Sequence, residues 1–154
     1  MAGVSDFEDL DAWRLAAALR DRVYAMTRRG PAARDFKFRD QIRDSAASGP
    51  RNISEGFGRF NPKENANYVR WALGSLNETR NHLLHGEQEG YFSNDDFRAA
   101  LSLVRRALGA TTRYWQYLDG CGGHVPGRPP RQSRKQTKPC SKRKKKGNAT
   151  NLEP

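Results

Sequence analysis

The sequence predicts an all-α fold, an antiparallel up-down-up-down four-helix bundle with a disordered, basic C-terminal tail. Apolar residues recur every three or four positions in four successive segments, which is the spacing of one helix face. Short turns separate these segments, and short connections favour antiparallel neighbours. The pattern stops near residue 120, where Gly, Pro, Lys and Arg predominate. We therefore expect one bundle domain at residues 1–119 and a tail at residues 120–154.

The first helix is expected over residues 6–29. Ser5 and Glu8 form a capping box ahead of an apolar run. Gly30 and Pro31 end the helix, because glycine suits the position after a helix C-terminus and proline cannot continue it. The apolar face is wider than one partner helix requires, so we expect it to pack against two neighbours, or against one neighbour and another subunit.

The second helix, expected over residues 35–60, contains Pro50. A proline inside a helix costs about 3 kcal/mol. The apolar period nevertheless continues beyond it at Ile53 and Phe57, which predicts one kinked helix rather than two. Three glycines in this segment each add about 1 kcal/mol of cost, and a close approach to a neighbouring helix would offset it. These glycines are Gly49, Gly56 and Gly58.

The third and fourth helices have clear starts. Asn61 is a capping residue and Pro62 takes the first helical position of the third helix, which ends before a turn at residues 90–92. The fourth helix is expected over residues 93–119, opening at Ser93. Its apolar residues alternate spacings of four and three, as in a helix packed along nearly parallel or antiparallel partners. They are Phe97, Leu101, Val104, Leu108, Thr111, Trp115 and Leu118.

The tail carries most of the net positive charge of the chain. Of the 28 Lys and Arg residues ten lie in residues 120–154, and of the 17 Asp and Glu residues only one does. A mobile basic arm binds nucleic acid through counterion release, and its lack of aromatic residues predicts weak sequence specificity. The alternatives are a tail that only aids solubility, or one that contacts an acidic membrane or another acidic partner. The residues expected to contact phosphates are Arg128, Arg131, Arg134, Lys135, Lys138, Lys142, Arg143, Lys144, Lys145 and Lys146.

Within the bundle, three arginines of the fourth helix are the least compensated by acidic neighbours. They are Arg105, Arg106 and Arg113. We expect them to form a basic surface patch that can contact nucleic acid. By contrast, Arg39 and Arg43 lie beside Asp40 and Asp44, which favours a solvated, salt-linked face over the alternative, a phosphate-binding surface.

No metal, cofactor or catalytic site is predicted. The third helix carries Glu78, His82, His85 and Glu89, but a metal site in a bundle also needs ligands from other helices. The tail offers three soft ligands, whereas structural zinc requires four. They are Cys121, His124 and Cys140. The chain has no nucleophile elbow, phosphate-binding loop or dinucleotide fingerprint, so we expect no enzymatic activity.

The sequence also predicts a cytoplasmic protein. The N-terminal residues are acidic and lack the basic start and apolar run of a signal peptide. No stretch approaches about 18 consecutive apolar residues, so no membrane span is expected. Both cysteines lie in the tail, outside any expected core, which fits a reducing compartment.

Three runs of residues are typical of a known family. Residues 41–59 contain Ser45-Ala46-Ala47-Ser48-x-Pro50-x-Asn52-Ile53-x-Glu55-Gly56-Phe57-Gly58-Arg59. The flanking runs are Phe7-x-Asp9-Leu10-x-Ala12-Trp13 and Gly74-Ser75-Leu76-x-Glu78-Thr79. Together they resemble the motifs of the S23, or 23S rRNA intervening-sequence, protein family, over about residues 6–119. The motif residues are Pro50, Asn52, Ile53, Glu55, Gly56, Phe57, Gly74, Ser75 and Glu78.

The resemblance implies a bacterial, non-enzymatic bundle that assembles into a homo-oligomeric ring, expected to be a pentamer. Members are often encoded within insertions in large-subunit rRNA genes, and related bundles accompany reverse transcriptases. Both associations imply a role with RNA, rather than DNA, or with an RNA-handling enzyme. The second hypothesis is therefore a protein–protein adaptor, since aromatic anchors suit interfaces. Its candidate contacts are Trp13, Tyr24, Trp71 and Trp115. The motif residues either shape the bundle or form a recognition surface or subunit contact.

Overall fold

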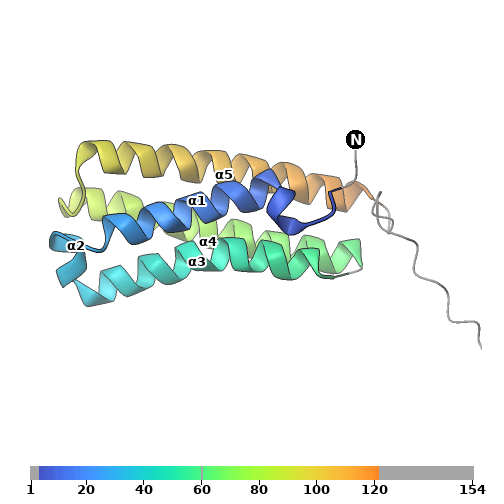
Figure 1. Cartoon of the computed structure of the whole chain (residues 1–154), viewed down its shortest axis with the longest axis horizontal. Coiled ribbons are helices and arrows are strands. Elements are labelled where there is room, and N and C mark those ends of the chain that lie inside the picture. The colour runs from blue at the N-terminus through green and yellow to red at the C-terminus, as the bar shows by residue number, and fades with distance from the viewer. Residues whose placement is uncertain (1–3, 60, 122–154) are drawn as a thin grey trace, which may run out of the picture.

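A computed structural model describes residues 4–59 and 61–121 of the 154-residue chain. Its elements, in chain order, are η1 (Phe7–Asp9), α1 (Asp11–Met26), α2 (Pro31–Arg34), α3 (Phe36–Phe57), α4 (Pro62–Gln88) and α5 (Asn94–Gly120). The four long helices lie lengthwise beside one another, with the short α2 at one end (Figure 1). Each long helix packs against two others, in the cyclic order α1, α3, α4, α5. The all-α four-helix bundle is confirmed, and the described residues form no strand.

The start of α1 differs from the prediction. The helix begins at Asp11 after the separate turn η1, so the expected capping box at Ser5 and Glu8 does not open it. Leu10 is 8% exposed and belongs to the core cluster, and its extended backbone separates the two elements. The Phe7 ring packs edge-on against Trp13, with 5.2 Å between centroids. Burial of these apolar side chains has therefore outweighed the local capping signal.

The connection from α1 to α3 also differs. α1 ends at Met26, and Pro31 begins α2 instead of terminating the first helix. Thr27 is fully buried at this end, and its Oγ1 donates a hydrogen bond to the Val23 carbonyl at 2.8 Å. Arg43 of α3 donates from Nε to Thr27 Oγ1 (2.8 Å) and from Nη2 to the Thr27 carbonyl (2.9 Å). Arg43 thus closes the end of α1 instead of contributing to a solvated charged face.

α3 runs without interruption through Pro50, which confirms the prediction of one helix. A close approach to α4 explains two of its glycines. A Cβ atom on Gly56 would lie 2.7 Å from both Asn65 Oδ1 and Tyr68 Cβ, and one on Gly49 would lie 3.2 Å from Leu76 Cδ2. Gly58 meets only carbonyl groups of its own helix end, so this explanation does not extend to it.

α4 and α5 begin where the sequence predicts. The Asn61 side chain accepts a hydrogen bond from the Lys63 amide at 2.9 Å, and Ser93 Oγ accepts from the Asp96 amide at 3.2 Å. The buried face of α5, however, is shifted towards small residues. Val104, Thr111 and Leu118 are buried as expected, together with Ala100, Ala107 and Ala110. The larger apolar residues of the expected seam are only half-buried; they are Phe97, Leu101, Leu108 and Trp115.

No helix in the described ranges is long and apolar enough to cross a membrane.

Candidate nucleic-acid interface

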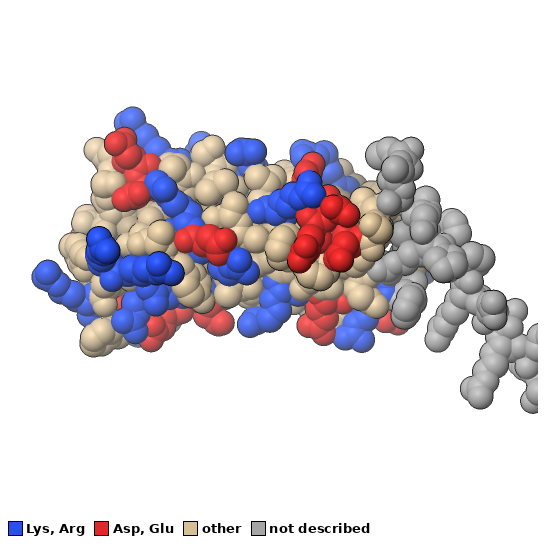
Figure 2. All heavy atoms as spheres, viewed as in Figure 1, with Lys and Arg blue, Asp and Glu red and all other residues tan. Residues whose placement is uncertain are grey.

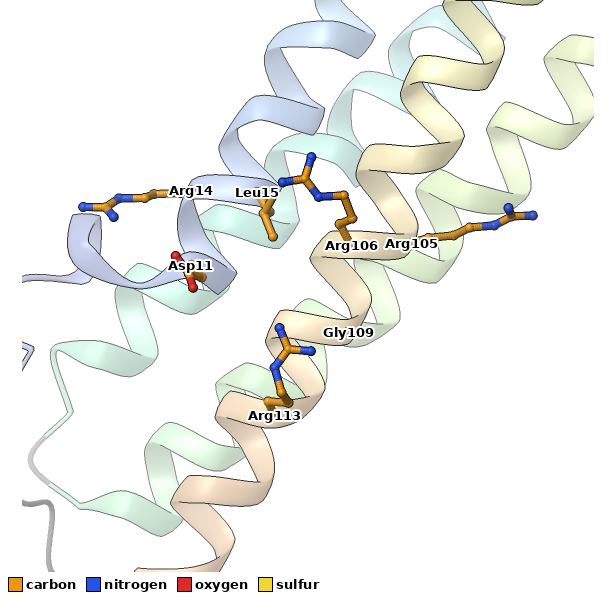
Figure 3. A pocket seen from close by; sticks show the side chains of 7 residues that line it. All are labelled: Asp11, Arg14, Leu15, Arg105, Arg106, Gly109 and Arg113. Atoms are coloured by element: carbon orange, nitrogen blue, oxygen red, sulfur yellow. The ribbon is translucent and has the colours of Figure 1, made fainter. Parts of the chain in front are cut away.

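An open hollow lies between α1 and α5, with a volume of about 660 Å³. All three arginines predicted as a basic patch on α5 line it, together with four other residues, as shown in Figure 3. The lining consists of Asp11, Arg14, Leu15, Arg105, Arg106, Gly109 and Arg113. The structure therefore brings Arg14 of α1, which sequence reasoning did not select, to the predicted patch.

The spacing of α5 residues builds this hollow, which we call the arginine groove. Arg106, Gly109 and Arg113 follow one another at intervals of three and four, so they share one face of the helix. Gly109 has no side chain, and the half-buried Leu15 lines the hollow from α1. Figure 3 shows Arg106 and Arg113 on the side of α5 that faces α1, whereas the Arg105 guanidinium points away from α1. The basic patch therefore covers two sides of α5.

The charges of the groove are only partly balanced. Arg14 pairs with Asp9 at 3.1 Å, while no carboxylate of the described residues pairs with Arg105, Arg106 or Arg113. Asp11 is the only carboxylate in the lining. An acidic surface borders the groove, since Figure 2 shows Asp and Glu side chains gathered over η1 and the start of α1. The arginine side of the groove suits phosphate oxygens, and the acidic side limits how far a polyanion can extend over α1.

A second basic region lies at the end of the bundle that holds α2. Figure 2 shows Lys and Arg side chains gathered over α2 and the start of α3. The chain contributes Arg28, Arg29, Arg34, Lys37 and Arg39 to this corner, which we call the α2–α3 corner. Sequence reasoning missed it because these residues belong to two helices and a turn. The available signal was a run of basic residues on both sides of Gly30-Pro31.

Two carboxylates belong to this corner, and both are bound by other groups of the protein. Asp35 caps α3, accepting from the Phe38 amide at 3.0 Å and from the Tyr91 hydroxyl at 2.8 Å. The Phe38 amide and then the Tyr91 hydroxyl lower the pKa of Asp35 below its usual range, and the same bond raises the pKa of Tyr91. Asp40 is bound to Arg39 at 2.8 Å. Both carboxylates are thus engaged within the protein.

The motif residues meet at the contact between α3 and α4. Ser75 Oγ donates to Ser48 Oγ at 2.8 Å, and Asn52 Nδ2 donates to the Ser48 carbonyl at 2.9 Å. Thr79 Oγ1 and Ser45 Oγ lie 3.1 Å apart and extend this hydroxyl network into the core. Among the other motif residues, Pro50, Ile53 and Gly56 are buried, Phe57 is half-buried, and Gly74, Glu55 and Glu78 are exposed.

The exposed part of the motif carries a small polar cluster. Glu55 pairs with Arg59 at 3.0 Å, and Arg59 donates to the Tyr68 hydroxyl at 2.7 Å. Hydrogen bonding to Tyr68 and then to Arg59 lowers the pKa of Glu55. Trp71 packs edge-on against Tyr68 with 4.7 Å between centroids and is 58% exposed. The other candidate adaptor aromatics, Trp13, Tyr24 and Trp115, are half-buried.

The predicted phosphate contacts of the tail, from Arg128 to Lys146, lie outside the described residues, as do His124 and Cys140. On α4, His82 lies 3.8 Å from Glu78, and His85 lies 3.7 Å from Glu89. Within residues 4–59 and 61–121, no group of three His, Cys, Asp or Glu residues could hold a metal ion.

Comparison with known proteins identifies relatives of this fold. Residues 8–110 match the family model of the 23S rRNA-intervening sequence protein. A similar solved structure is a protein of unknown function from the S23 ribosomal protein family of Bacteroides thetaiotaomicron. It is 17% identical, with a TM-score of 0.62, and the alignment covers 68% of this chain and 98% of that one. No curated protein matches the chain.

Proposed function

The chain belongs to the 23S rRNA-intervening sequence protein family, and we propose that it is a non-enzymatic accessory protein that binds RNA in the cytoplasm. The observation that carries the proposal is the group of Arg105, Arg106 and Arg113 at the hollow between α1 and α5, which are exposed and have no ion-pair partner among the described residues. The same helix ends at Gly120, and the basic residues 128–146 follow it in the sequence. The patch and the tail are therefore neighbours along one segment of chain.

The chemistry of this arrangement favours the phosphate backbone. A guanidinium presents several N–H donors in a fixed fork, which matches two phosphate oxygens. Arg106 and Arg113 stand two helical turns apart, or about 10 Å along the axis, so each binds a different phosphate. The ten basic residues of 128–146 add further positive charge. Binding is therefore strong at low salt, sensitive to salt and weakly specific for sequence.

A homo-oligomer strengthens this binding. The half-buried apolar residues of α5 support contact with a second copy, since burying them removes apolar surface from water. Resemblance to the family makes a pentameric ring the expected assembly. A ring carries several tails, and simultaneous engagement of one RNA raises the overall affinity far above that of one tail. Size-exclusion chromatography with light scattering measures the assembly directly, and a monomer would contradict this part of the proposal.

Fluorescence anisotropy with a labelled RNA tests the proposal. The full-length chain is compared with a tail variant, in which the ten basic residues of 128–146 become Gln, at about 50 and about 200 mM salt. The wild type should lose affinity by orders of magnitude over this range, and the tail variant should lose most of its binding. No binding by the wild type at about 50 mM salt would overturn the proposal.

A pair of matched variants tests the contribution of α5. Arg105→Gln, Arg106→Gln and Arg113→Gln are combined in one protein, and each lost phosphate contact should reduce the salt slope by about one. The control removes three exposed arginines from other positions, one on each of three helices: Arg51→Gln, Arg70→Gln and Arg98→Gln. Equal loss in both triple variants would mean that net charge, rather than the α5 patch, determines binding.

The exposed Trp71 favours a second candidate, a protein–protein adaptor for an RNA-handling enzyme such as a reverse transcriptase. Trp71 is the most exposed of the four candidate adaptor aromatics, and large aromatic side chains dominate the binding energy of interfaces. This candidate predicts that Trp71→Ala abolishes co-purification with such an enzyme and leaves RNA binding unchanged. Unchanged co-purification together with weaker RNA binding would refute the adaptor hypothesis.

A further inference from the structure

The α2–α3 corner exposes an aromatic ring. Phe36, the first residue of α3, is 65% exposed, the highest value among the large apolar side chains of the described residues. Phe38 lies two positions further, about 200° around the helix, and is buried in the core. The helix that buries Phe38 therefore turns Phe36 to the solvent. A single exposed apolar residue is ordinary, so the surroundings of the ring decide whether it is a site.

One side of the ring is occupied by a positioned cation. The Arg39 guanidinium carbon lies 4.8 Å from the centroid of the Phe36 ring. Arg39 Nε donates a hydrogen bond to Asp40 Oδ1 at 2.8 Å, which holds the guanidinium in place one helical turn beyond the ring. The guanidinium therefore covers one face of the Phe36 ring, and the side chain, which is 65% exposed, leaves further surface open to solvent. Aromatic rings and guanidinium planes are the two surfaces on which proteins stack the bases of unpaired nucleotides.

Further cations belong to the same corner. Arg28, Arg29, Arg34 and Lys37 are exposed, and none of them forms an ion pair within the described residues. The two carboxylates between residues 28 and 40 are engaged, Asp35 by Phe38 and Tyr91 and Asp40 by Arg39. The charge of the corner therefore remains available to phosphates on either side of a stacked base.

The other highly exposed aromatic residue has different surroundings. Trp71 is 58% exposed, and the positions three and four residues away on α4 are uncharged. They are Asn67, Tyr68, Gly74 and Ser75. An exposed aromatic ring among unpaired cations suits a nucleotide. The cation nearest to Trp71 in its cluster, Arg59, is paired with Glu55, so this ring attracts a polyanion less. Trp71 therefore provides a matched control for Phe36.

We propose that the α2–α3 corner binds unpaired nucleotides of RNA, with one base added to the stack of Phe36 and Arg39 and the flanking phosphates held by the other arginines of the corner and Lys37. This inference rests on the proposed RNA binding and names the part of the RNA that is recognised. Base-paired RNA keeps its bases stacked within the helix, so their faces are closed to Phe36. Every base has a flat face, so the site tolerates all four bases.

Full-length Phe36→Ala tests the proposal against two labelled RNAs of equal length, an unstructured strand and a blunt-ended duplex. Loss of one base–aromatic stack should weaken binding of the unstructured strand by about 5-fold to 150-fold. Affinity for the duplex, which has no unpaired base, should not change. Phe36→Trp restores a ring and should restore the affinity, which a merely structural role of Phe36 would not predict. Trp71→Ala should bind both RNAs as the wild type does.

The controls separate the possible failures. Thermal unfolding of Phe36→Ala should match that of the wild type, because the side chain is mostly exposed. Wild-type binding of both RNAs with no effect of Phe36→Ala would overturn the stacking site and leave the proposed function intact. No binding of either RNA by the wild type would overturn both. Tighter binding to an acidic peptide than to RNA, with no effect of Phe36→Ala, would also refute the site.

Discussion

The α3–α4 contact and the α1–α5 contact differ in whether their polar side chains are paired between the helices. Across α3 and α4, hydroxyl groups bind one another, as Ser75 does with Ser48. Between α1 and α5 one ion pair, Arg22 to Asp96 at 2.8 Å, links the helices. The arginines further along α5 remain exposed. The first contact therefore uses its polar groups to align two helices, whereas the second leaves charge available to a ligand.

Because of this difference, we expect changes in the first contact to affect stability and changes in the second to affect RNA binding. A change in the α3–α4 contact should alter the free energy of unfolding, because its hydroxyl groups are paired and at least half-buried. A change of the α5 arginines should leave the free energy of unfolding within about 0.5 kcal/mol and alter RNA binding instead. Three further predictions test the structural side of the comparison.

The largest effect is expected for Gly56→Ala. The added Cβ would lie 2.7 Å from Tyr68 Cβ and 3.2 Å from the Asn65 carbonyl oxygen, so α3 and α4 must separate. Overpacking of this kind lowers the free energy of unfolding by about 1–3 kcal/mol, which urea denaturation measures. Gly74→Ala is the control on α4, because its Cβ would meet nothing within 4 Å. It should raise stability by up to about 1 kcal/mol through helix propensity. Equal destabilisation by both changes would contradict the close approach.

A smaller effect is expected for Thr79→Val. Thr79 is fully buried, and its Oγ1 donates to the Ser75 carbonyl at 2.8 Å and lies 3.1 Å from Ser45 Oγ. Losing this network should cost about 1 kcal/mol in urea denaturation.

Thr111→Val is the matched control on α5. Thr111 is equally buried, but its hydroxyl has no hydrogen-bond partner. Since removing an unsatisfied polar group relieves its desolvation cost, this variant should be as stable as the wild type or more stable. If both valine variants lost the same stability, the two contacts would not differ in the way described.

The smallest effect concerns pH and the end of the bundle. The pKa of Asp35 lies below its ordinary value of 3.8, so its stabilisation is complete above that value and is lost as pH falls through the lower, folded-state pKa. Asp35→Asn should therefore be less stable than the wild type near neutral pH, and the difference should shrink in strong acid. Urea denaturation at about pH 7 and about pH 2 measures it. Tyr91→Phe removes only one of the two hydrogen bonds and should show a weaker trend of the same sign. A difference that grew in acid would contradict this account.

Much of the fold could be predicted because its signals are local. Asn61-Pro62 and Ser93 start helices in the structure as they do in the pattern, since a cap satisfies amide groups only two or three residues away. Pro50 did not break α3, because the apolar face continued in phase on both sides of it. The α5 arginines were found because their own helix neighbours lack carboxylates. The α2–α3 corner was missed because its residues become neighbours only after a turn.

The sequence by itself determined the four helices, each with one apolar face, their order, and the starts of α4 and α5. Only the tertiary structure decided that Leu10 separates η1 from α1 and that Arg43 closes the end of α1. It also decided that α5 buries Ala100, Ala107 and Ala110 and leaves Leu101 and Leu108 half-buried. The physical reason is distance along the chain. Capping and periodicity depend on residues within one or two turns. Burial and hydrogen bonding between helices depend on groups that are far apart in the sequence, and those groups meet only once the bundle has formed.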